Sequence, residues 1–191
     1  MQLGWITLSQ QSLVWGSLLI VPIFFTAAEY VQYSLSVRLS AIVALVMMAV
    51  NFAMAAPLAR ASSAGDMATV RELHSRTIRL VCLGSGGMAL GVLLLGAQIE
   101  KFFGITSMLL LGALLGSQVM FSIAASSALA LAMLGEERKS LVAHAGVNGL
   151  GLLAFTALAA TGPLNGAASS LLIANGALSI VLTRCVRSAV G

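Results

Sequence analysis

Residues 51–79, NFAMAAPLARASSAGDMATVRELHSRTIR, form the largest polar island in this sequence. An apolar run ends here at Pro57, a Ser- and Gly-rich turn follows, and charged residues gather as far as Arg79. Segments long enough to cross a bilayer lie on both sides, and a Pro break with a Ser/Gly cluster marks a connection between such segments. The island is therefore predicted to be a solvent-side loop, residues 60–79, that carries a short amphipathic helix.

The predicted amphipathic helix has one apolar face, because Val70, Leu73 and Thr77 recur at positions i, i+3 and i+7. Asp66 precedes this helix and is expected to cap it and to favour its amino-terminal dipole. We expect the helix to lie along the inner membrane surface, with Arg71 and Arg79 toward anionic headgroups. The residues predicted to characterise this cytoplasmic loop are Pro57, Gly65, Asp66, Arg71 and Arg76.

The composition indicates an all-α polytopic membrane protein. Hydrophobic residues make up 59% of the chain and charged residues 8%, whereas soluble domains have about 25% charged residues. The apolar runs are continuous and exceed the roughly 10 alternating residues of a barrel strand, so helices are the expected way to pair every backbone group within lipid. The two cysteines, Cys82 and Cys185, match no disulfide or metal pattern, and no cofactor is expected.

The apolar runs predict a single six-helix membrane lobe over residues 1–191, because each is long enough to cross a bilayer. Residues 102–106 are expected to form an interfacial entry to the fourth span. The predicted spans are residues 5–28, 39–59, 80–99, 107–134, 141–160 and 167–183.

The basic residues predict the orientation, because short cytoplasmic loops carry the excess of Lys and Arg. The loops after the second, fourth and sixth spans hold eight of the ten basic residues, and only Arg38 and Lys101 lie on the opposite side. Both termini are therefore predicted to be cytoplasmic. The net charge of +4 is explained by this asymmetry, so no nucleic-acid partner is expected.

Short motifs occur along the chain in a specific order. APLAR at 56–60 is followed by AGD at 64–66, and FFG at 102–104, LGE at 134–136 and GPLNGAA at 162–168 follow downstream. In this order they resemble the carboxy-terminal six-helix lobe of the polysaccharide flippases of the multidrug/oligosaccharidyl-lipid/polysaccharide exporter superfamily. The resemblance covers nearly the whole chain.

The resemblance implies a transporter and not an enzyme. Such a protein flips a lipid-linked oligosaccharide or polysaccharide precursor across the bacterial cytoplasmic (inner) membrane by alternating access of a central cavity. Family members usually have two such lobes, so the resemblance also implies a second six-helix lobe as partner, together with membrane lipids. A fragment, a split gene product and a half-size protein are all compatible with a single lobe.

Polar residues inside the predicted spans are the candidate substrate-binding residues, because polar groups in lipid tend to face protein or water. Asn51, Gln118, Asn148 and Asn175 are the clearest, and each either lines a cavity or bridges two helices by a hydrogen bond. Gln118 is the strongest cavity candidate because it lies near the middle of the long fourth span.

Arg38 is the candidate cationic contact for the pyrophosphate of the substrate. It stands at the head of a predicted span on the side where positive charge is scarce, and a guanidinium can grip phosphate oxygens in two places. The competing interpretation is that Arg38 extends to the outer headgroups without binding substrate.

Three other functions were weighed. A drug or cation antiporter is expected to bury an acidic residue for its coupling ion, and all six acids are predicted in loops or at span ends. A non-transporting membrane partner subunit is the second alternative. An intramembrane serine protease built on Ser85 and His144 is disfavoured, because Leu83 stands where that family's motif has glycine.

Overall fold

The computed structural model describes residues 2–105 and 107–191, with side chains from residue 12 onward. Every regular element in these ranges is an α-helix. The helices are α1 (Gln2–Phe24), α2 (Ala27–Ser40), α3 (Ile42–Ser63), α4 (Met67–Leu94), α5 (Gly96–Phe103), α6 (Met108–Met133), α7 (Glu137–Thr161) and α8 (Leu164–Val190).

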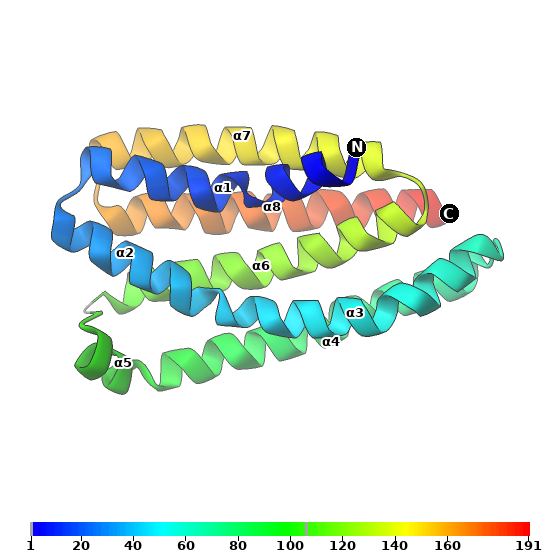
Figure 1. The fold of residues 1–191 in the computed structure, drawn as a ribbon, viewed down its shortest axis with the longest axis horizontal. Coiled ribbons are helices and arrows are strands. Elements are labelled where there is room, and N and C mark those ends of the chain that lie inside the picture. The colour runs from blue at the N-terminus through cyan, green and yellow to red at the C-terminus, as the bar shows by residue number, and fades with distance from the viewer. Residues whose placement is uncertain (1, 106) are drawn as a thin grey trace.

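The long helices lie side by side as a bundle with two distinct ends (Figure 1). One end, here named the α5 end, contains the α1–α2 turn, α5 and the α7–α8 turn. The other, here named the C-terminal end, contains Gly191 and the turns at 64–66 and 134–136. Helix α6 is central, because it packs against α2, α3, α4 and α8, while α7 packs between α1 and α8.

Five segments of the described chain are long and apolar enough to cross a membrane. They are Ala27–Ser63, Met67–Leu94, Met108–Met133, Glu137–Thr161 and Leu164–Val190, and Ser12–Phe24 is a shorter apolar helix. The protein is therefore a multi-pass helical membrane protein. This finding supports the expected class, but it does not by itself establish the predicted count of six spans.

Local chemistry sets the helix boundaries. Thr26 caps α2, because its side chain accepts a hydrogen bond from the Glu29 backbone while the Glu29 carboxylate accepts one from the Thr26 backbone. This reciprocal arrangement pairs donors that a helix start leaves unsatisfied. At the C-terminal end, Gly65 has a φ of 70°, which glycine adopts without strain. Asp66 then caps α4 by accepting from the Thr69 backbone, as the sequence predicted.

The second predicted span begins twelve residues later than the helix that contains it. The prediction placed the start at residue 39, whereas α2 begins at Ala27 and passes into α3 through a single turn residue, Ala41. Ala41 itself has helical dihedral angles, with φ −62° and ψ −21°. Segment Ala27–Ser63 is thus a nearly continuous helix, and the first predicted span ends at Phe24 instead of residue 28.

Pro57 does not end its helix, contrary to the prediction, because α3 runs on to Ser63. A proline inside a helix removes one hydrogen bond and costs about 3 kcal/mol. Packing offsets that cost here, since Leu58 and Ala61 immediately beyond Pro57 are buried in one apolar cluster with residues of α4, α6 and α8.

The predicted surface helix at 60–79 is not a separate element either. Helix α4 runs without interruption from Met67 to Leu94, because no helix-breaking residue separates the charged part from the apolar part. The face that contains Val70 and Thr77 was predicted correctly, and it packs into the bundle. One buried stripe continues along the whole helix, through Val70, His74, Thr77, Val81, Ser85 and Ala89.

The third predicted span, residues 80–99, does not match one helix, because α4 begins at Met67 and ends at Leu94, and residues 96–99 belong to α5. The last three predicted spans correspond to helices with small shifts. Spans 107–134 and 141–160 match α6 and α7 closely, while α8 extends beyond 167–183 at both ends. Residues 102 and 103 of the predicted interfacial entry, 102–106, form the last part of α5, a short helix at the α5 end of the bundle that ends at Phe103. Thr106 lies outside the described residues.

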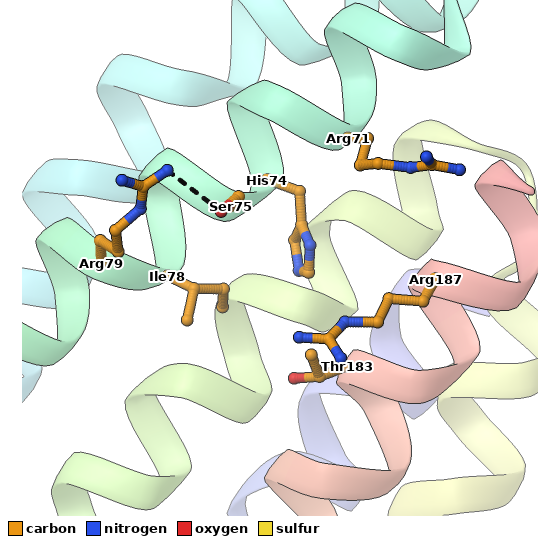
Figure 2. Close-up of a pocket in the computed structure, with 7 residues that line it drawn as sticks. All are labelled: Arg71, His74, Ser75, Ile78, Arg79, Thr183 and Arg187. Atoms are coloured by element: carbon orange, nitrogen blue, oxygen red, sulfur yellow. Dashed lines mark hydrogen bonds between the residues drawn. The ribbon is translucent and has the colours of Figure 1, made fainter.

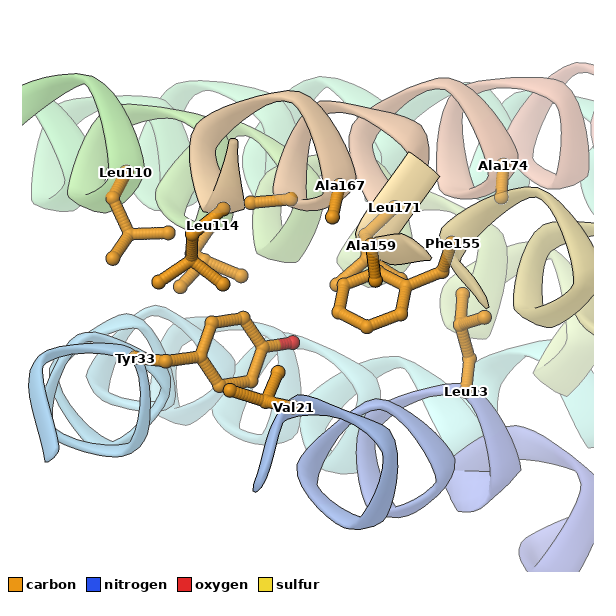
Figure 3. Packing of buried hydrophobic residues seen from close by; sticks show 12 residues of the cluster. Leu13, Val21, Tyr33, Leu110, Leu114, Phe155, Ala159, Ala167, Leu171 and Ala174 are labelled. Carbon is orange, nitrogen blue, oxygen red and sulfur yellow. The ribbon is translucent and has the colours of Figure 1, made fainter. Parts of the chain in front are cut away.

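The apolar core near the α5 end is assembled from five helices (Figure 3). The rings of Tyr33 and Phe155 lie 6.0 Å apart with a tilt of 54°, within the range of favourable aromatic pairs. Helices α7 and α8 approach closely here, because a Cβ atom at Gly151 would stand 2.7 Å from the Cβ atom of Ala174. This packing fixes α1, α2 and α6 around the site described below.

The orientation can be tested by cysteine labelling in a background in which Cys82 and Cys185 are replaced by Ala. Ser63 and Thr161 are both exposed and lie at opposite ends of the bundle. We expect an impermeant maleimide added to intact cells to label Thr161→Cys and not Ser63→Cys, because the basic loops lie at the Ser63 end. Labelling of Ser63→Cys alone would reverse the predicted orientation, and lysed cells provide the control for reactivity.

Candidate functional site

A cavity of about 200 Å³ lies inside the bundle, between α1, α2, α3, α6 and α8. Its lining is largely apolar, and it is named the polar cavity here for the six polar side chains in its wall, Ser17, Tyr33, Ser40, Ser117, Gln118 and Asn175. Ser17, Ser117 and Asn175 line it and lie between seven and eleven residues from the helix ends at the α5 end. At 1.5 Å per residue these positions are about 10–17 Å from that end. Each of the three residues is nearer to the α5 end than to the other end of its helix, so the cavity lies in the half of the bundle toward the α5 end.

Tyr33 and Ser17 form the polar wall of the cavity between α1 and α2. The Tyr33 hydroxyl donates a hydrogen bond of 2.7 Å to Ser17 Oγ, which in turn donates one of 2.8 Å to the carbonyl of Val14. Tyr33 and Ser17 are both fully buried. The pair satisfies two hydroxyl groups that would otherwise be costly in a low-dielectric interior.

Asn175 and Gln118 bring α8 and α6 to the same cavity, and both were predicted from the sequence as candidate residues. The Asn175 amide donates a hydrogen bond of 2.8 Å to Ser117 Oγ, so this side chain bridges two helices. Gln118 lines the cavity and makes no side-chain hydrogen bond to another described residue. Of these two amides, Gln118 therefore has the greater capacity to bind a polar ligand.

Arg38 lies on an adjoining groove of about 520 Å³ between α1 and α2. Val14, Val37 and Ala41 line both this groove and the polar cavity. Arg38 is eleven residues after Ala27, which corresponds to about 16 Å along α2. Arg38 therefore does not begin a helix, because it lies within the continuous Ala27–Ser63 segment. Its place at the head of a membrane span stays a prediction.

The Arg38 side chain is exposed to the groove and forms no ion pair with any residue that the structure describes. An unneutralised arginine inside a membrane span is costly in lipid unless it faces water, protein or an anionic ligand. The interpretation that Arg38 extends to the headgroups stays a prediction beside that of a phosphate contact.

Asn51 and Asn148 lie apart from the cavity and act as bridges between helices. Asn51 Oδ1 accepts a hydrogen bond of 2.7 Å from Ser126, which joins α3 to α6. The Asn148 amide lies 3.4 Å from Ser12 Oγ, which joins α7 to α1. Their proposed part in substrate binding stays a prediction.

The five residues predicted to characterise the cytoplasmic loop lie in the last turns of α3, in the turn at 64–66 and in the first turns of α4. None of them lines the polar cavity. They are Pro57, Gly65, Asp66, Arg71 and Arg76. Asp66 is exposed, and hydrogen bonds from the Thr69 side chain and backbone hold the pKa of its carboxyl below the usual value. Arg71 lines a separate cleft between α4 and α8, whereas Arg76 is exposed outside that cleft.

Ser85 and His144 are not paired. Ser85 lies on α4, which packs against α3 and α6, whereas His144 lies on α7, which packs against α1 and α8. The Ser85 hydroxyl has no hydrogen-bond partner among the described residues, and His144 Nδ1 lies 2.9 Å from the carbonyl of Ser140. Nothing described here activates Ser85 as a nucleophile, which needs an adjacent base.

Sequence reasoning missed Tyr33, Ser17 and Ser117 as cavity residues. Tyr33 was passed over because residues 29–38 were taken for a connection, although a capping box at Thr26 and Glu29 marks a helix start. Serines are common in transmembrane helices, where each can bond its own helix backbone. Their position at the cavity follows only from how the helices pack.

Replacing Tyr33 by Phe tests the hydrogen-bonded wall. We expect the free energy of unfolding in mixed micelles to fall by about 0.5–1.5 kcal/mol, the range measured for polar contacts between membrane helices. Tyr30→Phe is the control, because the Tyr30 hydroxyl makes no hydrogen bond to a described residue. Equal effects of the two substitutions would show that the Tyr33–Ser17 bond does not stabilise the bundle.

No protein-family model matches the sequence, and no curated protein or solved structure matches the chain. The comparisons assign no family, and the resemblance to polysaccharide flippases rests on the order of the short motifs alone.

Proposed function

We propose that this chain is one lobe of a flippase that moves a lipid-linked oligosaccharide or polysaccharide precursor across the bacterial cytoplasmic membrane. The observation that carries the proposal is the position of Arg38, an exposed arginine deep in the Ala27–Ser63 segment and beside a polar cavity. An ionisable residue inside a transmembrane segment is by default a candidate for a transport pathway. The motif order described above agrees with this class.

The two parts of the site suit two parts of such a substrate. Arg38 supplies a permanent positive charge and a planar fork of donors, which suits the oxygens of a pyrophosphate. Gln118, in the adjoining cavity, offers an amide that can both donate to and accept from sugar hydroxyls. The apolar groove wall formed by Trp15, Leu18 and Leu19 suits a prenyl chain.

The size of the cavity favours a site shared with a second lobe. Pockets that enclose small molecules are about 300–1,000 Å³, whereas this cavity holds about 200 Å³. The adjoining groove is open along α1 and α2, and its exposed apolar residues include Trp15 and Leu19. In the proposed assembly, α1 joins the five longer apolar segments as a sixth span, and a partner lobe covers this groove.

An antiporter has less support than a flippase. All six acidic residues are described, and they lie at helix starts, in the first two turns of α4, in α5 or at turns near the bundle ends. None lines the polar cavity or the Arg38 groove. A non-transporting partner subunit has no need of a solvent-accessible arginine at this depth, so Arg38 also disfavours that alternative.

The proposal is tested by flipping of a fluorescent prenyl-pyrophosphate saccharide in proteoliposomes that contain the full chain and its partner lobe. We expect Arg38→Ala and Arg38→Lys both to lower the flipping rate at least about tenfold, because neither can form the bidentate phosphate contact. Arg60→Ala is the control, since Arg60 is an exposed arginine in the last turn of α3, outside the cavity and groove.

Wild-type flipping in Arg38→Ala would remove Arg38 from the pathway and refute the proposal. Wild-type flipping in Arg38→Lys alone would show that charge suffices and that the bidentate contact is wrong. Binding of the same saccharide lipid to each purified variant is measured in parallel, so that loss of binding is separated from loss of movement.

A further inference from the structure

A second cleft, of about 590 Å³, lies between α4 and α8 near the C-terminal end of the bundle (Figure 2). It is separate from the Arg38 groove, because it shares no lining residue with it. Its volume falls within the range of pockets that hold small ligands. Three arginines line it: Arg71 and Arg79 from α4, and Arg187 from α8.

The cleft is positively charged and has no acidic counterpart. No carboxylate lines it among the described residues. The one ion pair between described residues joins Lys139 to Glu136 at the α6–α7 turn, so none of the three arginines is neutralised by a salt bridge. Three uncompensated guanidinium groups around one concave surface favour an anionic ligand.

Most of the hydrogen-bonding capacity of these arginines is unused. Arg71 donates one bond of 3.2 Å to the carbonyl of Val190, and Arg79 donates one of 3.3 Å to Ser75 Oγ. Arg187 makes no side-chain hydrogen bond to a described residue, and its guanidinium extends toward His74 and Thr183 (Figure 2). Each guanidinium has five N–H donors, and their fork matches phosphate oxygens.

The floor of the cleft is a short polar chain that joins three helices. His74 Nε2 lies 3.2 Å from Ser127 Oγ on α6, and Ser127 Oγ lies 3.2 Å from the Thr183 hydroxyl on α8. His74 is buried, so these contacts fix its ring against α6. The arrangement links α4 to α8 through α6, and the Arg187 guanidinium lies between the His74 ring and Thr183 in the view of Figure 2.

The surroundings of the cleft point to a lipid as the source of the anion. Arg79 is the last charged residue of α4, and the apolar part of the helix begins at the next residue. Leu83, Leu90 and Leu94 continue from Arg79 on about the same face, at i+4, i+11 and i+15, and all three are exposed. A positively charged cleft that continues into an exposed apolar strip suits an anionic lipid, because the headgroup can bind in the cleft and the acyl chains along the strip. A soluble anion would need only the positive charge of the cleft.

We propose that the cleft between α4 and α8 binds the phosphate of an anionic phospholipid headgroup, with the acyl chains along the exposed leucines of α4. Basic pockets between transmembrane helices on the side rich in Lys and Arg are suited to such headgroups. Arg187 on α8 binds the phosphate oxygens from one wall, and Arg79 on α4 reaches them from the other wall once its guanidinium turns away from Ser75, while Arg71 adds charge at the rim. The site does not depend on the proposed flippase activity.

The test measures binding of phosphatidylglycerol to the purified full chain in detergent, by native mass spectrometry and by displacement of a fluorescent analogue. We expect Arg187→Gln and Arg79→Gln each to weaken binding about tenfold, as expected for the loss of one charge-assisted phosphate contact. Arg76→Gln is the matched control: Arg76 lies on α4 one turn from Arg79 but outside the cleft. It should bind as the wild type does.

Two further arms identify the source of the phosphate. Phosphatidylcholine should not compete, because its headgroup carries no net charge, and inorganic phosphate should not displace the bound lipid. Displacement by inorganic phosphate at concentrations matched to the lipid would assign the cleft to a soluble phosphate and overturn the lipid proposal.

Equal weakening in Arg76→Gln and Arg187→Gln would also overturn the proposal, because it would show general attraction to a basic surface. So would unchanged binding in both cleft variants. Circular dichroism melting checks that each variant is folded. If Arg187→Gln unfolds, Arg79→Gln decides the result, because Arg79 is exposed and its one hydrogen bond is to Ser75 on its own helix.

Discussion

The hydrocarbon core of a bilayer offers no hydrogen-bond partner, and this constraint determines most of the structure. Backbone groups must pair inside helices, which accounts for the all-helical fold. Several buried polar side chains pair between helices as well. Tyr33 donates to Ser17, Asn175 donates to Ser117, and Asn51 accepts from Ser126, so each joins two helices. These bonds contribute modest free energy individually. Together they fix which faces of the helices meet, because any other rotation would leave a polar group unpaired in an apolar interior.

The proposed sites contain polar or charged side chains that have no such partner among the described residues. Arg38 has no ion pair among the described residues although it lies deep in the Ala27–Ser63 segment, and Gln118 faces the adjoining cavity without a side-chain hydrogen bond to a described residue. At the other end of the bundle, Arg187 is likewise unpaired within the described chain. In the two proposals, these separate cationic sites each bind an anionic amphiphile: a substrate pyrophosphate at Arg38 and a phospholipid headgroup in the cleft between α4 and α8.

Much of the fold could be predicted from the sequence, because long apolar runs and clustered charge report directly on lipid-facing helices. Two features could not. Residues 29–38 were predicted to connect two spans because they include the polar residues Glu29, Gln32 and Arg38. In the structure they belong to α2, which is capped and continuous with α3. Pro57 was taken as a helix end, because its local penalty is visible in the sequence while the packing around Leu58 that offsets the penalty is not.

The site was predicted only in part, because tertiary packing is not visible in the sequence. Asn175 and Gln118 stand out as polar residues in apolar runs, whereas their convergence with Tyr33 depends on tertiary packing.

The proposed function requires α2 to belong to the membrane-spanning segment, so that Arg38 lies within the bilayer and not at its surface. The most direct measurement is the depth of a nitroxide spin label at Val31, an exposed apolar residue of α2 between Thr26 and Arg38. Its accessibility to oxygen and to a water-soluble nickel complex is compared with that of a label at exposed Thr26, in the protein reconstituted in liposomes. The account predicts that the label at Val31 is more accessible to oxygen and less accessible to the nickel complex than the label at Thr26. A label at Val31 that is as accessible to the nickel complex as the one at Thr26 would place α2 outside the bilayer and contradict the account.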